Sequence, residues 1–152
     1  MSEVLFYHLS ETPLENSLPE MLERSLARGW RAILRAGSEA ELVRLDAYLW
    51  SYRDEAFLPH GRGEDGTAAR QPVYLTCGAE NPNGATVLML VGGARVIAAE
   101  IAAFARTCLI FDGGDAAMRD AARADWRIVT DSGLPAKYWA QEAGRWVQRA
   151  GA

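Results

Sequence analysis

Three arginines near the C-terminus recur at a spacing that could bind an anion. Arg119, Arg123 and Arg127 are four residues apart in a segment with helical periodicity, so they share one face. Trp126 lies one turn after Arg123. Guanidinium groups fork onto carboxylates, and an indole beside the aliphatic stems of arginine can line a slot for an aromatic ring. The pattern is therefore chemically suited to an anionic ligand that carries an aromatic group.

An ordinary solvated helix face explains the same residues without a ligand. In that interpretation Arg119 pairs with Asp115, and Arg127 pairs with Asp131, on the surface. The residue pattern by itself favours this simpler interpretation. Four apolar side chains on the opposite face are expected to point to the core: Ala117, Ala121, Ala124 and Ile128.

Two aspartates, Asp112 and Asp115, follow a predicted strand at residues 106–111. Open α/β sheets bind ligands at the carboxyl ends of their strands, and two carboxylates there could hold Mg²⁺. The alternative hypothesis is therefore a small α/β enzyme that binds a phosphorylated ligand. Asp115 is equally suited to cap the following helix, which needs no ligand, and capping is favoured. Because no P-loop, nucleophile elbow or other catalytic partner accompanies the pair, we predict no catalytic residue.

Two further patterns are expected to bind nothing. Residues 61–66 read Gly-x-Gly-x-x-Gly, but no helix follows them, and Glu64 and Asp65 would repel a phosphate, so this segment is predicted to be a polar loop. Residues of the kind that bind zinc lack short ligand spacing, so we predict no metal site and no cofactor. We expect these residues to be reduced core thiols and a surface imidazole: His8, His60, Cys77 and Cys108.

The bulk composition indicates an ordinary soluble domain. The chain length of 152 residues favours one domain over residues 1–152. The net charge of −4 argues against strong DNA binding. Its two cysteines fit a reducing compartment. It has no signal-peptide pattern and no apolar run near the ~20 residues that span a bilayer, so we expect a cytoplasmic protein without a membrane partner.

Apolar runs and helical periodicity predict an alternation of strands and helices. Strands are expected at residues 4–9, 30–36, 73–77, 86–91 and 106–111, with a turn at residues 81–84 and helices between the other strands. Pro19 suggests that the first helix begins near Leu18, and residues 95–105 and 115–132 are expected to be helices. The alternation indicates parallel pairing. The predicted fold is a three-layer α/β/α Rossmann-like sandwich with a mostly parallel sheet of about five strands.

The helix in the middle of the chain organises the rest of the prediction. Ser38 and Glu41 form a capping-box pattern, and Leu42, Leu45, Leu49 and Trp50 follow at helical spacing, so this face is expected to pack inward. Pro59 keeps the residue before it extended. An aromatic segment is therefore expected near the surface at this end of the helix.

Residues 3–134 resemble the chi subunit family of the bacterial DNA polymerase III holoenzyme. The resemblance depends on an opening Phe6-Tyr7 strand, on the arginine-bearing last helix, and on two motifs, Leu45-Asp46-x-x-Leu49-Trp50 and Phe57-x-Pro59-His60. It implies an accessory subunit without catalytic activity, which connects the clamp loader, through the psi subunit, to single-stranded DNA-binding protein.

The resemblance also implies two interaction sites. The basic helix would take up the acidic C-terminal tail of single-stranded DNA-binding protein, which ends in Pro-Phe and a free carboxylate, and Trp126 stands where the family usually has tyrosine. The tail site would comprise Arg119, Arg123, Trp126, Arg127 and Gly133. The psi subunit, or another partner, would contact Trp50, Phe57 and Pro59. A core position is the simpler interpretation, more so for Trp50 than for Phe57.

The resemblance does not extend to the C-terminal segment. Residues 135–152 are an extension of unassigned role, in which residues 140–148 are a candidate helix.

Overall fold

A computed structural model describes residues 2–52, 58–62 and 66–151 of the chain. Its strands are β1 (Glu3–Leu9), β2 (Ala32–Ala36), β3 (His60–Gly61), β4 (Val73–Thr76), β5 (Val87–Val91), β6 (Arg106–Asp112), β7 (Ala136–Glu142) and β8 (Arg145–Gly151). Its α-helices are α1 (Leu14–Ala27), α2 (Glu39–Ser51), α3 (Ala98–Ile101) and α4 (Ala116–Asp131), with a 3₁₀ turn at Ala68–Arg70. None of the helices in these ranges is long and apolar enough to cross a membrane.

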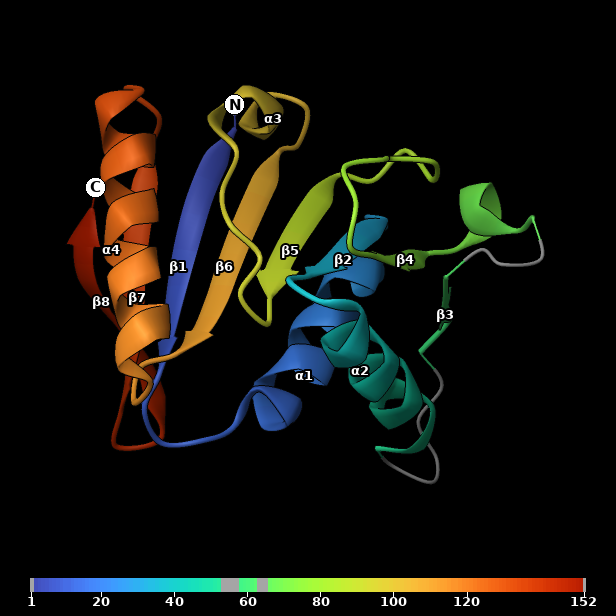
Figure 1. Ribbon diagram of the computed structural model, residues 1–152, viewed down its shortest axis with the longest axis horizontal. Helices are drawn as coiled ribbons and strands as arrows, with labels where there is room; N and C mark the ends of the chain where they lie inside the picture. Colours follow the sequence, from blue (N-terminus) through green and yellow to red (C-terminus); the bar gives the residue numbers. More distant parts are fainter. Residues whose placement is uncertain (1, 53–57, 63–65, 152) are drawn as a thin grey trace.

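The strands form one mixed sheet in the order β3-β4-β2-β5-β6-β1-β7-β8 (Figure 1). Neighbouring strands are parallel except for β7 and β8, which are antiparallel. The prediction of an α/β protein with a mostly parallel sheet is confirmed. The expected count of about five strands is wrong, because β3, β7 and β8 add to the five predicted runs.

Helices cover both faces of the sheet. Leu18 and Leu22 of α1 and Leu42 and Leu45 of α2 are buried in one core cluster with one face of the central strands. Ile101 of α3 and Ala122 and Val129 of α4 are buried in a second cluster on the other face. Because the buried central strands β2 and β5 contribute alternate side chains to both clusters, they read as continuous apolar runs.

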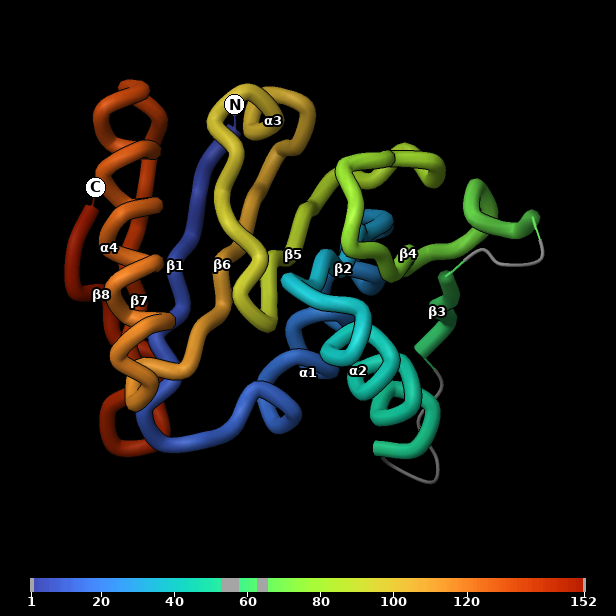
Figure 2. Tube along the Cα trace, in the orientation of Figure 1, coloured from blue at the N-terminus to red at the C-terminus, as the bar shows by residue number. Residues whose placement is uncertain are grey.

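The C-terminal extension is a β-hairpin, so the helix suggested for residues 140–148 is wrong. Its turn residues Ala143 and Gly144 both have positive φ, 52° and 77°, as in the two-residue type I′ turn that matches the twist of paired strands. β7 pairs along β1, in parallel, from Val4 to His8. The tube in Figure 2 follows this last segment (red) along the outer side of β1.

Side chains next to β1 hold the hairpin in place. The Oε1 atom of Gln141 accepts hydrogen bonds from the backbone N–H groups of residues 10–12, at 2.9–3.2 Å. The Glu11 carboxylate accepts from the turn N–H groups of Ala143 and Gly144, at 3.1 and 2.9 Å. These contacts join residues about 130 positions apart in the sequence. They explain why local patterning did not reveal the hairpin.

The predicted helix caps are confirmed. The Ser38 hydroxyl accepts from the N–H of Glu41 at 3.2 Å, and the Asp115 carboxylate accepts from two N–H groups at the start of α4. Gly133, with φ of 75°, ends α4. Two other boundaries differ from the prediction: α1 begins at Leu14, with Pro19 inside it, and α3 covers four residues instead of 95–105.

The buried face of α4 is not the predicted one. Ala117, Ala124 and Ile128 are exposed, and Ala121 is partly exposed. The face that packs on the sheet contains Ala122, Asp125 and Val129. Asp125 is 1% exposed, and its carboxylate is bound by the Arg95 guanidinium at 2.8–3.1 Å and by the N–H of Val96 at 3.2 Å. The prediction failed because Asp125 made this face appear polar in the sequence, whereas its buried carboxylate pairs with Arg95, thirty residues away.

Candidate functional site

The arginine row of α4 lies on the surface with few close carboxylates. Arg119 is partly buried and donates to the Gly113 carbonyl oxygen at 3.1 Å. Arg123 has a side chain that is 69% exposed, and its nearest ion-pair partner is Asp120 at 3.9 Å. Within the part of the chain that the structure describes, no ion pair forms at Arg127. The pairs expected for a solvated face, Arg119 with Asp115 and Arg127 with Asp131, are absent from the described residues.

Trp126 is half-buried beside this row and is held by two other rings. It packs edge-on against Phe6 of β1, with ring centroids 5.2 Å apart, and against Tyr138 of β7, at 5.9 Å. Phe6 and Tyr138 in turn stack on each other at 6.3 Å. The indole is therefore a fixed wall between the helix and the sheet, on the same side as the arginines.

Tyr138 and His8 extend the candidate site toward the first turn of α4. The Tyr138 hydroxyl lies 2.7 Å from His8 Nδ1. Burial and the nearby positive charge of Arg119 lower the pKa of His8. Burial raises the pKa of Tyr138, although the charges of Arg123 and Arg119 oppose that shift. Both guanidinium groups thus lie close enough to act electrostatically on this tyrosine.

Not every residue of the predicted tail site is brought together. Gly133 lies seven residues beyond Trp126, roughly 10 Å at the rise of an α-helix, and roughly 21 Å beyond Arg119. Its exposed position and positive φ are explained by the helix end. Arg119, Arg123, Trp126 and Arg127 form the compact part, and we call this set, with Tyr138 and His8, the α4 surface. Only an extended ligand could reach from it to Gly133.

The second predicted site lies at the other end of the sheet, beside the edge strand β3 (Figure 1). Trp50, at the end of α2, is 60% exposed, so the inward orientation expected for it is wrong, whereas Leu42, Leu45 and Leu49 are buried as predicted. Pro59 is partly buried. Phe57 lies outside the described residues.

The exposed ring of Trp50 packs against the imidazole of His60. The two ring centroids are 4.2 Å apart, and the His60 side chain is fully buried. Its Nδ1 lies 2.6 Å from the Leu58 carbonyl oxygen, and its Nε2 lies 3.3 Å from a carboxylate oxygen of Asp46. The expected surface imidazole is therefore a buried one. We call Trp50, Pro59 and the His60 beneath them the Trp50 surface.

The aspartates of the alternative hypothesis line an acidic cavity of about 490 Å³ at the carboxyl ends of β1, β5 and β6. Asp115 caps α4, as predicted, and Asp112 accepts from the N–H of Gly114 at 2.9 Å. Three glutamates share the lining with one arginine, Arg44, which pairs with Glu15 and Glu41. This charge balance opposes a phosphorylated ligand.

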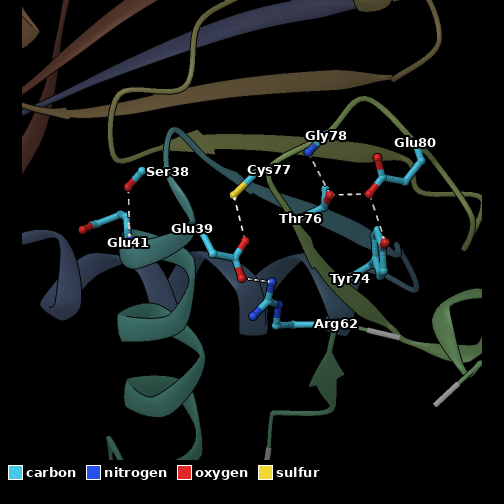
Figure 3. Close-up of polar contacts among 9 residues, drawn as sticks. All are labelled: Ser38, Glu39, Glu41, Arg62, Tyr74, Thr76, Cys77, Gly78 and Glu80. Carbon is cyan, nitrogen blue, oxygen red and sulfur yellow. Dashed lines mark hydrogen bonds and ion pairs between the residues drawn. The ribbon is translucent and has the colours of Figure 1, made fainter. Parts of the chain in front are cut away.

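The cysteines and histidines do not converge on a metal site. No group of three or more His, Cys, Asp or Glu side chains lies at metal-binding distance within the described ranges. Cys108 is buried, whereas Cys77 is exposed and lies 3.8 Å from the Glu39 carboxylate, which also binds Arg62 (Figure 3). Partial burial and this carboxylate raise the pKa of the Cys77 thiol, so the group is not activated as a nucleophile.

The sequence did not assign Tyr138, His8 or Asp125 to a functional region. Tyr138 reaches the α4 surface because β7 pairs with β1, and Asp125 is fixed by Arg95. The Tyr138-Trp139 pair, which is typical of strands, was the one local signal of β7.

Comparison with known proteins identifies the family. Residues 1–137 match the family described as DNA polymerase III chi subunit, HolC. The chain is similar to the probable DNA polymerase III subunit chi of Rickettsia prowazekii, with 28% identity over 91 residues, which cover 60% of this chain but 55% of that relative. It is 31% identical over 116 residues to the DNA polymerase III subunit chi of Pseudomonas aeruginosa, covering 76% and 78% of the two chains. The chain therefore belongs to the DNA polymerase III chi subunit family, a family of accessory, non-catalytic subunits.

Proposed function

We propose that this protein is a replisome adaptor in the cytoplasm, which links the clamp loader to the C-terminal tail of single-stranded DNA-binding protein. Family membership supports a role in DNA replication. The helices on both faces of the sheet support the assignment of a three-layer Rossmann-like sandwich. The acidic cavity at Asp112 and Asp115 gives little support to the alternative of an enzyme with a phosphorylated ligand.

The observation that carries the proposal is the composition of the α4 surface. Two exposed guanidinium groups, on Arg123 and Arg127, lie beside a half-buried indole that is held by Phe6 and Tyr138. A tail with aspartates, a terminal phenylalanine and a free carboxylate would place its charges on the arginines and its ring against Trp126. The resemblance implies that the family usually has tyrosine at the position of Trp126. In this chain, Tyr138 places a hydroxyl beside the Trp126 ring.

The clamp-loader contact is proposed for the Trp50 surface. A large apolar ring that is 60% exposed is a frequent anchor of protein interfaces, and the buried His60 keeps it in place. The partner would be the psi subunit or an equivalent clamp-loader protein. Because the two surfaces lie at opposite ends of the sheet, both partners could bind at once.

Titration of a labelled tail peptide tests the proposal. Each charge-assisted contact to a partly exposed carboxylate contributes about 1–3 kcal/mol, so Arg123→Ala should weaken binding about ten-fold or more. Amidation of the peptide C-terminus should have a similar effect, and affinity should fall as salt screens the charges. Arg70→Ala, at an exposed arginine outside α4, is the matched control and should change nothing. Tight binding that ignores both Arg123→Ala and amidation would place the tail elsewhere.

A further inference from the structure

A second cavity lies on the face of the sheet opposite α4, between α1 and the C-terminal hairpin. It encloses about 430 Å³, within the size range of small-molecule sites. Side chains from α1, from the strands β1, β5, β6, β7 and β8, and from Arg28 and Trp30 between α1 and β2 line it. We call it the hairpin pocket and define it by six of them: Arg24, Arg28, Trp30, Arg106, Trp139 and Trp146.

Aromatic rings form the walls of the hairpin pocket. Three of the five tryptophans of the chain line it. Trp146 of β8 is fixed edge-on against Tyr7 of β1, with ring centroids 5.2 Å apart. Trp139 and Trp146 come from the hairpin, so this pocket exists because residues 136–151 add two strands to the sheet. Flat, rigid rings of this kind are suited to stack on a planar ligand.

Arginines give the pocket a positive charge. The guanidinium groups of Arg28 and Arg106 lie over the Trp30 ring, 5.0 and 5.2 Å from its centroid. Arg106 also pairs with Glu3, and Arg24 pairs with Glu20 in an exposed i,i+4 contact. In the described part of the chain, no carboxylate forms an ion pair with Arg28. The charged residues that line the pocket are therefore three arginines and one glutamate, Glu20, the reverse of the acidic cavity at the carboxyl ends of the strands.

We propose that the hairpin pocket binds one nucleotide unit of single-stranded nucleic acid, with the base against the indoles and the phosphate at the guanidinium groups. Aromatic platforms beside arginines are the general means by which proteins hold single strands. A phosphate concentrates its charge on one group, which suits the two guanidinium groups of Arg28 and Arg106 over the same Trp30 ring better than the dispersed carboxylates of an acidic peptide would.

The proposal is compatible with the absence of strong DNA binding that the net charge of −4 predicts. A pocket of this volume holds a single nucleotide, so the contact is weak and local. The proposal does not depend on the α4 surface, because the two regions lie on opposite faces of the sheet.

Tryptophan fluorescence of the full chain, titrated with oligo(dT), tests this inference. We expect quenching that saturates and weakens as salt is raised. Arg28→Glu, at an exposed residue of the pocket, should weaken binding about ten-fold or more, whereas Arg70→Glu, the matched charge reversal outside it, should not. Trp146→Leu should also weaken binding, and Arg123→Ala should leave it unchanged. Equal binding of thymidine monophosphate would support the pocket and identify a free nucleotide as its ligand.

Three results would overturn the inference: no quenching by either probe, equal losses from Arg28→Glu and Arg70→Glu, or binding of an acidic peptide at this pocket in place of the oligonucleotide. The last result is separable from failure of the tail site. If the tail occupied the hairpin pocket, Arg28→Glu would abolish peptide binding while Arg123→Ala would not. If both proposals are right, each variant affects its own ligand alone.

Discussion

The α4 surface and the Trp50 surface both present a tryptophan, but the surrounding structure holds the two rings differently. Trp126 is half-buried and contacts Phe6 and Tyr138 from two strands, with arginines beside it. Trp50 is 60% exposed at the end of α2 and rests on the buried imidazole of His60. The Trp126 ring therefore contributes to the packing of the domain, whereas most of the Trp50 ring is exposed to solvent.

Under the proposed function, this difference corresponds to two kinds of recognition. A rigid ring beside exposed guanidinium groups offers a shaped and charged site, which suits a short ligand that brings its own carboxylates. An exposed ring without a basic row offers apolar area, which suits a folded partner that covers it. Loss of the tryptophan ring should therefore affect both stability and peptide binding at the α4 surface, but association alone at the Trp50 surface.

The largest effect is expected from the anchor beneath the α4 surface. Arg95→Ala leaves the Asp125 carboxylate, which is 1% exposed, without its guanidinium partner. Loss of one partner of a fully buried ion pair costs about 3–5 kcal/mol, and because the Arg95 side chain is 49% exposed, the free energy of unfolding should fall by an amount near the lower end of this range. Urea unfolding measures it. The double variant Arg95→Ala, Asp125→Ala should recover part of the loss; if it is no more stable than the single variant, the pair is not what fixes α4.

Trp126→Ala should destabilise the protein by about 2 kcal/mol, below the 3–5 kcal/mol of a fully buried aromatic residue, because the ring is half-buried. Trp126→Tyr keeps a ring against Phe6 and should retain most of the stability and of the peptide binding. The matched variant, Trp50→Ala, should change stability by less than about 1 kcal/mol, because most of its ring is already in water. Equal losses in urea unfolding would remove the contrast between the two rings.

Trp50→Ala should instead weaken the clamp-loader contact, with a loss of up to about 2 kcal/mol if the ring is an interface anchor. Titration calorimetry with the partner measures this loss, and tail-peptide binding in the same variant should stay unchanged. Trp126→Ala serves as the reciprocal control. A Trp50→Ala protein with full affinity for every clamp-loader component would show that the ring serves another purpose.

Sequence patterning predicted the features of the fold that depend on neighbouring residues. The caps at Ser38 and Asp115 and the end of α4 at Gly133 each follow from contacts within about five residues. The hairpin was missed because alanine, glutamine, glutamate and arginine, which favour helices, separate its aromatic residues. Its stability comes from pairing with β1 and from contacts to Glu11, more than a hundred residues away.

Long-range contacts explain the errors at the candidate sites as well. The buried face of α4 was predicted on the wrong side of the helix because an aspartate such as Asp125 is expected at the surface unless its partner, Arg95, is known. Trp50 was expected in the core because it follows Leu49 in an apolar helix face, whereas in the last turn of α2 its ring packs against His60 of the edge strand β3 and stays 60% exposed. The arginine row was predicted correctly as a feature of one helix face, while Tyr138 could be added only through the sheet order.

The smallest predicted effect concerns pH at the α4 surface. Burial and the charge of Arg119 lower the pKa of His8 from its ordinary value of 6.5, while Asp112 opposes this shift. The unfolded chain therefore binds a proton at a higher pH than the folded chain does. Stability from this group is fully present above about pH 6.5 and is lost as pH falls through the folded-state pKa. His8→Gln, which keeps a polar neighbour for Tyr138, should flatten this part of the pH profile in thermal unfolding.

A carboxylate bound at Arg119 would favour the protonated imidazole of His8, so tail-peptide affinity in the wild type should rise slightly with acidity and stay flat in the His8→Gln variant. Identical profiles for the two proteins would show that His8 remains in one protonation state at this surface.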